Sequence, residues 1–263
     1  MPARYRQALA ERKRAGAILF RRNLTSLEST RALCTAIATV DPDAPPFIAV
    51  DEEGGRVGRL PAPYQRLPPM RELAQTLTLN GLEREGEKLG ETLAKLGFNL
   101  DFAPVLDVDT NPANPIIGDR AFSNVPHEAA RRALAFAKGL STHVMTCGKH
   151  FPGHGDTHLD SHLALPIIEH DDARLRSVEL VPFAAASPRG VDSMMSAHIV
   201  VTAWDPSTPA TLSHKICTKI LREELGFDGV LFSDDLEMKA VADLYPVEVS
   251  SGSRDPKPDT TFC

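Results

Sequence analysis

Several features that would mark a membrane, secreted or nucleotide-binding protein are missing from this 263-residue chain. No apolar run approaches the roughly 20 residues that a bilayer span requires, and the amino terminus lacks the apolar segment of a secretory signal. The four cysteines are scattered and form no CxxC pair, which predicts free thiols in a reducing, cytoplasmic compartment. There is no GxGxxG or GxxxxGK[ST] motif, so nucleotide binding has no support. A net charge of −6 argues against affinity for nucleic acid or anionic membranes.

What is present is an alternation of short apolar runs with amphipathic segments. The apolar runs suit buried parallel strands and occupy residues 16–20, 47–51, 99–108, 143–150, 191–201 and 229–235. The segments between them predict helices at 82–96, from Pro126 to Gly139, from Asp171–Asp172 onward, and from a Ser213 cap to Gly226. Such an alternation predicts a parallel α/β sheet, either a barrel or a doubly wound fold.

The placement of polar residues favours the barrel. They follow several different strands, whereas a doubly wound sheet concentrates its ligand at one switch point. These strand-end residues are Asp51, Asp107, Lys149, His150, His198, Asp234 and Asp235. The composition then changes at residue 246 to Ser, Pro, Asp and Thr, so we expect a barrel domain over 1–245 and a disordered tail over 246–263.

The loop KHFPGHGDTHLDSHLALP (149–166) concentrates histidine and aspartate, the residue types used for metal binding and for proton transfer. The metal interpretation is disfavoured because no HExxH spacing is present. Asp160 and His162 are two residues apart, so in an extended segment both side chains project to one side and the carboxylate can orient the imidazole. Taken alone, this pattern is also what a solvated polar loop contains.

A second carboxylate makes the proton-transfer interpretation more specific. FSDDLEM (232–238) ends an apolar strand in two aspartates, of which Asp235 can cap the next helix and Asp234 is then free to act as a nucleophile. A nucleophilic carboxylate opposite a proton donor is the arrangement of retaining glycosidases. Asp51 and Arg59 in VDEEGGRVGRL (50–60) and Arg120 in GDRAF (118–122) can hydrogen-bond sugar hydroxyls.

These motifs, with NLDFAPVLDV (99–108) and KHFPGHGD followed by DSH, resemble the glycoside hydrolase family 3 β-N-acetylhexosaminidases of the NagZ type. The resemblance implies a TIM-type (β/α)₈ barrel and a retaining exo-β-N-acetylglucosaminidase that acts in peptidoglycan muropeptide recycling. It implies no cofactor, no metal, no nucleic-acid or membrane partner, and a carbohydrate substrate; we expect a monomer. By motif it assigns Asp234 as nucleophile, His162 as general acid/base and Asp160 as its orienting group. The implied sugar-binding residues are Asp51, Arg59, Arg120, Lys149 and His150.

The chain departs from the family at both ends. The family's first and eighth strands have no counterpart here, so we expect about six of the eight barrel strands, as in a chain truncated at both ends. Such a barrel would leave a gap between two unpaired edges. Two alternatives to the glycosidase therefore remain: a catalytically inactive remnant of the family, and a metal-dependent hydrolase. His154, Asp156 and His158 match no catalytic position of the family and are interpreted as loop structure.

Overall fold

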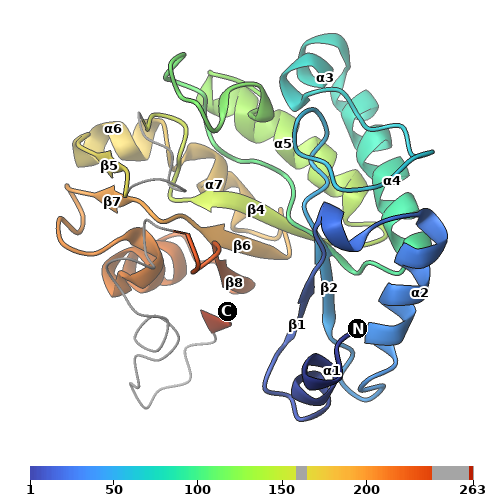
Figure 1. Cartoon of the computed structure of the whole chain (residues 1–263). Coiled ribbons are helices and arrows are strands. Elements are labelled where there is room, and N and C mark those ends of the chain that lie inside the picture. Colours follow the sequence, from blue (N-terminus) through green and yellow to red (C-terminus); the bar gives the residue numbers. More distant parts are fainter. Residues whose placement is uncertain (158–164, 239–260, 263) are drawn as a thin grey trace.

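The fold is built on a parallel sheet that curls around an apolar interior (Figure 1). The computed structural model describes residues 1–157, 165–238 and 261–262. Every pairing in the main sheet is parallel, in the order β1-β2-β3-β4-β6-β8-β9. The strands of this sheet are β1 (Gly16–Ile18), β2 (Phe47–Val50), β3 (Leu100–Asp101), β4 (Met145–Phe151), β6 (Ser193–Ser196), β8 (Val230–Ser233) and β9 (Thr261–Phe262).

Helices connect the strands and lie along the outer side of the sheet (Figure 1). The α-helices are α1 (Ala3–Ala10), α2 (Leu27–Ala38), α3 (Met70–Thr76), α4 (Leu79–Leu96), α5 (Pro126–Leu140), α6 (Asp172–Ser177) and α7 (Val181–Ala186). Shorter 3₁₀ turns are η1 (Arg21–Asn23), η2 (Gly118–Arg120) and η3 (Ala210–Leu212), and η4 (Lys215–Glu224) has π-type hydrogen bonding. Within the described ranges, no helix combines the length and the hydrophobicity that a membrane span requires.

The predicted helices are confirmed, and two of the expected end residues, Gly97 and Asp171, cap them. Leu82, Leu89 and Leu93 are buried on one face of α4, and Gly97 ends that helix in the left-handed conformation at φ +93°. Asp171 caps α6 by accepting a hydrogen bond from the Arg174 backbone N–H at 2.8 Å. The fourth predicted helix is η4, and Ser213 lies two residues before its start with Oγ accepting from the Ile216 N–H at 3.3 Å.

All six predicted strands are present, and two of them are corrected in extent. The run 99–108 pairs regularly only at β3, because Pro104 has no N–H to donate; the chain then continues beside β4 through Leu106. The run 191–201 is divided into β6 and a separate strand, β7 (Val200–Val201), which pairs with β5 (Ile167–Ile168) outside the main sheet. The short β9 comes from the segment predicted as a tail, and the rest of 246–263 lies outside the described residues.

The inner face of the sheet carries its own apolar cluster, distinct from the larger core between sheet and helices. Phe232 of β8 makes edge-to-face contacts with Phe47 of β2 and with Phe102, at ring-centroid distances of 5.6 and 5.4 Å. Such contacts are possible only if the sheet curls far enough to bring β2 and β8 face to face across the interior. The fold is therefore an incomplete TIM-type barrel, as predicted, and the carboxyl ends of its strands converge on one rim.

Candidate active site

The rim at the carboxyl ends of the strands collects the polar residues that the sequence analysis identified. Asp51 follows β2, Asp107 follows β3, and Asp234 follows β8. Lys149 and His150 lie within β4, and their side chains are almost fully buried. Arg59 and Arg120 reach the same rim from the loops after β2 and β3. The described residues of the predicted set thus belong to one site.

Lys149 is the centre of a buried ion-pair network. Its Nζ lies 2.9 Å from Asp51 Oδ1 and 2.6 Å from Glu53 Oε1. Burial lowers the pKa of Lys149, but the two carboxylates outweigh burial and raise it above the ordinary lysine value. Lys149 is therefore a fixed positive charge at the floor of the site.

Glu53 joins Lys149 to Arg120. The Arg120 guanidinium donates two parallel hydrogen bonds to the Glu53 carboxylate, Nε to Oε2 and Nη2 to Oε1, each at 2.8 Å. Burial raises the pKa of Glu53, but Arg120 and Lys149 outweigh it and hold the pKa well below the ordinary value. Glu53 is 2% exposed, so it positions the two cations and does not present itself to solvent.

His150 is oriented by a carboxylate of its own. His150 Nδ1 lies 2.7 Å from Asp107 Oδ2, and Asp107 Oδ1 accepts the His154 backbone N–H at 2.6 Å. Burial raises the pKa of Asp107, yet its histidine neighbours prevail and the pKa is lowered. The other ring nitrogen of His150 faces Arg120 Nη2 at 3.4 Å. Asp107 therefore fixes the ring plane of His150 at the rim.

Asp234 is held in its ionised form. Burial raises its pKa, but the charges of His150 and His198 outweigh burial and bring the pKa below the ordinary aspartate value. The Asp235 backbone N–H also donates to Asp234 Oδ1 at 2.8 Å. Asp235 accepts the Glu237 N–H at 2.9 Å and so holds the turn that follows. The helix that Asp235 is predicted to cap lies outside the described residues. An ionised carboxylate on the rim of the site is the form that a nucleophile needs.

The histidine-rich loop is described in part. His154 is buried, with its Nδ1 2.7 Å from Thr157 Oγ1 and its carbonyl accepting from Asn114 Nδ2 at 2.9 Å. Those contacts agree with its interpretation as loop structure. Asp156 contacts His170. Asp160, His162 and His158 lie outside the described residues.

Sequence reasoning missed Glu53 and gave Asp107 no role. Glu53 follows the predicted strand 47–51 and Asp107 lies near the end of the predicted strand 99–108, and the sequence carries no other signal for either residue. Glu52, the neighbour of Glu53, is also buried, but its Oε2 accepts the backbone N–H groups of Arg59 and Leu60 at 2.6 and 2.9 Å. The sequence alone does not distinguish the glutamate that holds a turn from the one that serves the site.

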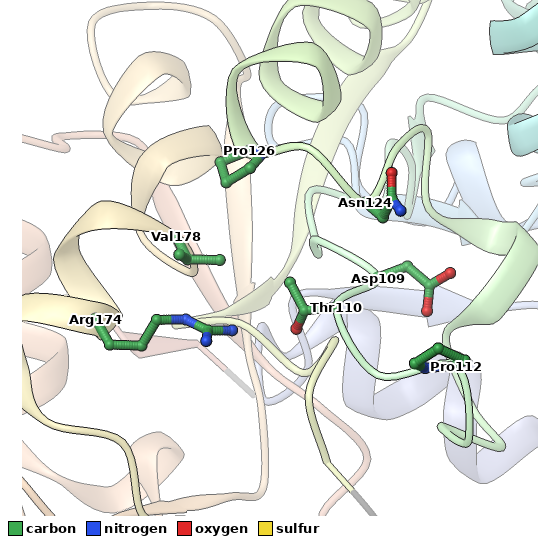
Figure 2. Close-up of a pocket in the computed structure, with 7 residues that line it drawn as sticks. All are labelled: Asp109, Thr110, Pro112, Asn124, Pro126, Arg174 and Val178. Carbon is green, nitrogen blue, oxygen red and sulfur yellow. The ribbon is translucent and has the colours of Figure 1, made fainter.

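A cavity of about 350 Å³ lies beside this site between the loop after β3 and helix α6 (Figure 2). None of the predicted site residues that the structure describes lines it. Its walls are formed by Asp109, Thr110, Pro112, Asn124, Pro126, Arg174 and Val178.

Comparison with known proteins agrees with this geometry. The β-hexosaminidase of Pseudomonas aeruginosa (strain LESB58) is 41% identical over 240 residues, which are 90% of this chain and 71% of that protein. The structure of NagZ from Neisseria gonorrhoeae superposes with a TM-score of 0.84 at 39% identity, over 90% of this chain and 71% of that one.

A family 3 β-N-acetylglucosaminidase from Paenibacillus sp. str. FPU-7 gives a TM-score of 0.91 at 37% identity, and this chain spans about half of it, 48%. The sequence model described as the glycosyl hydrolase family 3 N-terminal domain matches residues 1–252. The curled sheet, the ionised Asp234 at its rim and these matches together place the chain in glycoside hydrolase family 3, as a representative of the family's N-terminal domain.

Proposed function

We propose that this protein is a retaining exo-β-N-acetylglucosaminidase whose nucleophile is Asp234. The observation that carries the proposal is the environment of Asp234, an aspartate at a barrel rim whose pKa is lowered by neighbouring charges. The β-hexosaminidase and NagZ relatives support the substrate class. One NagZ structure holds N-trifluoroacetyl-D-glucosamine, a ligand of the same sugar type.

The sugar would be held by the network around Lys149. Lys149 and Asp51 form a close ion pair, while Arg59 Nη2 lies at a looser 3.8 Å from Asp51 Oδ2. A loosely paired arginine and a carboxylate at the rim can exchange part of their mutual contact for hydrogen bonds to sugar hydroxyls. Arg120 and His150 complete the proposed binding set.

The reaction would proceed in two displacements. Asp234 attacks the anomeric carbon while the bond to the leaving-group oxygen breaks and His162 donates a proton to that oxygen. A covalent glycosyl-enzyme results, and His162 then takes a proton from water as the water attacks the same carbon and frees Asp234. Asp160 would orient His162 and stabilise its charged form. The roles of Asp160 and His162 rest on the family motif.

The experiment compares two adjacent aspartates on a chromogenic β-N-acetylglucosaminide. Asp234→Asn should abolish turnover, whereas Asp235→Asn should retain most of it because Asp235 caps the following turn. Mass spectrometry of protein incubated with a slow fluorinated substrate should find the sugar on the peptide containing Asp234. Equal activity of Asp234→Asn and wild type would refute the assignment, and activity that survives a chelator would exclude a metal-dependent hydrolase.

The finer aspects of the proposal concern the natural substrate and its setting. We propose that the substrate is an N-acetylglucosamine-containing muropeptide of peptidoglycan recycling. We also propose that the protein acts in the cytoplasm as a monomer. The free thiols of Cys34, Cys147 and Cys217 support a reducing compartment. Release of N-acetylglucosamine from purified muropeptides, measured beside the chromogenic substrate, tests the substrate.

One observation favours a second candidate, a family member that binds sugar without turnover. Within the described residues the sheet is open, with β1 at one edge and β9 at the other. Catalysis depends on rigid positioning more steeply than binding does. A thermal unfolding midpoint that rises with N-acetylglucosamine, in the absence of any hydrolysis, would favour this candidate over the enzyme.

A further inference from the structure

A group of potential metal ligands lies outside the proposed sugar site. Asp156 belongs to the loop after β4, His170 to the segment between β5 and α6, and Glu179 to the junction of α6 and α7. One ligand atom from each side chain lies within 4.8 Å of the other two. The three elements are separate in sequence, so the fold itself brings the group together.

Glu179 is the member whose burial needs an explanation. It is 2% exposed, and its Oε2 has no hydrogen-bond partner among the described residues. The backbone of Gly153 closes over it, since a Cβ at that position would lie 2.9 Å from Glu179 Cβ. A buried carboxylate oxygen without a partner is costly. The fold therefore holds a carboxylate in place that a cation would stabilise.

Arg174 supplies a positive charge to this group. Its Nη2 lies 3.1 Å from Glu179 Oε1 and 3.9 Å from Asp156 Oδ2. The Arg174 side chain is 36% exposed and also borders the 350 Å³ cavity, where Figure 2 shows its guanidinium extending toward Thr110. The Arg174 guanidinium thus supplies the positive charge that a bound metal ion would otherwise supply. The adjacent cavity gives the side chain room to move away from the two carboxylates.

We propose that Asp156, His170 and Glu179 bind a divalent transition-metal cation, with Zn²⁺ the best fit. One imidazole nitrogen and two carboxylate oxygens suit Zn²⁺, whereas Mg²⁺ and Ca²⁺ prefer ligand sets made of oxygen alone. Two carboxylates balance the charge of the ion once Arg174 has withdrawn. The site ties the loop after β4 to the junction of α6 and α7, and it does not depend on the proposed glycosidase activity, because no proposed catalytic residue is a ligand.

Calorimetric titration of the metal-free chain with Zn²⁺ in a non-chelating buffer tests the site, with Mg²⁺ as the comparison ion. We expect one Zn²⁺ per chain and no measurable heat with Mg²⁺. His170→Ala should weaken Zn²⁺ binding by at least the roughly 10- to 100-fold that loss of an outer-shell partner costs. His170 is a partly exposed side chain, so this variant should fold. The control His127→Ala removes an exposed histidine on α5 and should bind as wild type does.

Arg174→Ala provides the sharper test. If the guanidinium competes with the metal, its removal should tighten Zn²⁺ binding, and Glu179→Gln should weaken it. A saturating Zn²⁺ concentration should raise the unfolding midpoint of wild type and leave that of His170→Ala unchanged. Wild-type affinity in both His170→Ala and Glu179→Gln, or loss of binding in His162→Ala instead, would overturn the proposal.

Discussion

Replacing Glu53 with glutamine is the most direct perturbation of the ion-pair network beneath the sugar site. The substitution keeps the shape of the side chain and removes its charge. Lys149 and Arg120 both lose a charged partner, and their side chains are only 3% and 11% exposed. Lys149 retains Asp51 at 2.9 Å, whereas Arg120 retains the Ile116 carbonyl at 3.1 Å. Among the described residues, the buried guanidinium is then left without a counter-charge in contact.

The expected loss follows from the cost of breaking a buried pair by removing one partner, about 3–5 kcal/mol. This is a large fraction of the roughly 5–15 kcal/mol by which a native domain is stable. For a domain of this size about 1 kcal/mol shifts the unfolding midpoint by roughly 2–4 °C. Glu53→Gln should therefore lower the midpoint by roughly 6–20 °C.

Thermal and urea unfolding at pH 7, followed by circular dichroism, measure this loss. The matched control is Glu128→Gln, since Glu128 also contacts two arginines, Arg131 and Arg132, but on the exposed side of α5. The control should unfold close to wild type because solvent screens surface pairs. If Glu53→Gln changed the free energy of unfolding by less than about 0.5 kcal/mol, as an ordinary surface substitution does, the reasoning would be wrong.

Two further predictions concern pH. His198→Gln should move the acid limb of the kcat/KM profile to higher pH, since the charge of His198 helps to lower the pKa of Asp234; an unchanged limb would show that His198 does not act on the nucleophile. The folded-state pKa of Asp107 is lowered, so its ionised form contributes stability above its unfolded value and loses that contribution as pH falls through the folded value. Asp107→Asn should therefore be less stable than wild type at pH 7, with the difference shrinking between roughly pH 5 and pH 2; a difference independent of pH in urea unfolding would contradict the lowered pKa.

The sequence predicted elements better than it predicted their ends. Each of the six apolar runs contains a strand, because burial on both faces of a parallel sheet selects continuous apolar residues. The run 191–201 gave no sign of its division, since Val200 and Val201 are even more apolar than Ser193–Ser196 of β6, and both strands are buried. The sheet that β7 joins depends on its pairing with β5, and the residues of β7 alone do not specify that pairing.

The site, like the fold, could be predicted only in part from the sequence. Asp51, Lys149, His150 and Asp234 could be selected from the sequence because each lies at or near the carboxyl end of a buried strand, and parallel strands bring those ends to one rim. The sequence could not select Glu53 over Glu52, since the path of the backbone after β2 decides which of the two side chains faces the site. It also could not assign Asp107 to His150, a pairing across 43 positions.

The sequence by itself determined the fold class, the family and the rim at which the chemistry is expected, because periodicity and motif are properties of order along the chain. Only the tertiary structure decided which charges meet. Lys149 and Asp51 are 98 positions apart and come within 2.9 Å because the strands that carry them curl around one interior. The ionised state of Asp234 is likewise set by the charges of His150 and His198, which are distant in sequence and outweigh the effect of burial. Electrostatic energy depends on the distance between charges and on the exclusion of water, and the folded chain sets both.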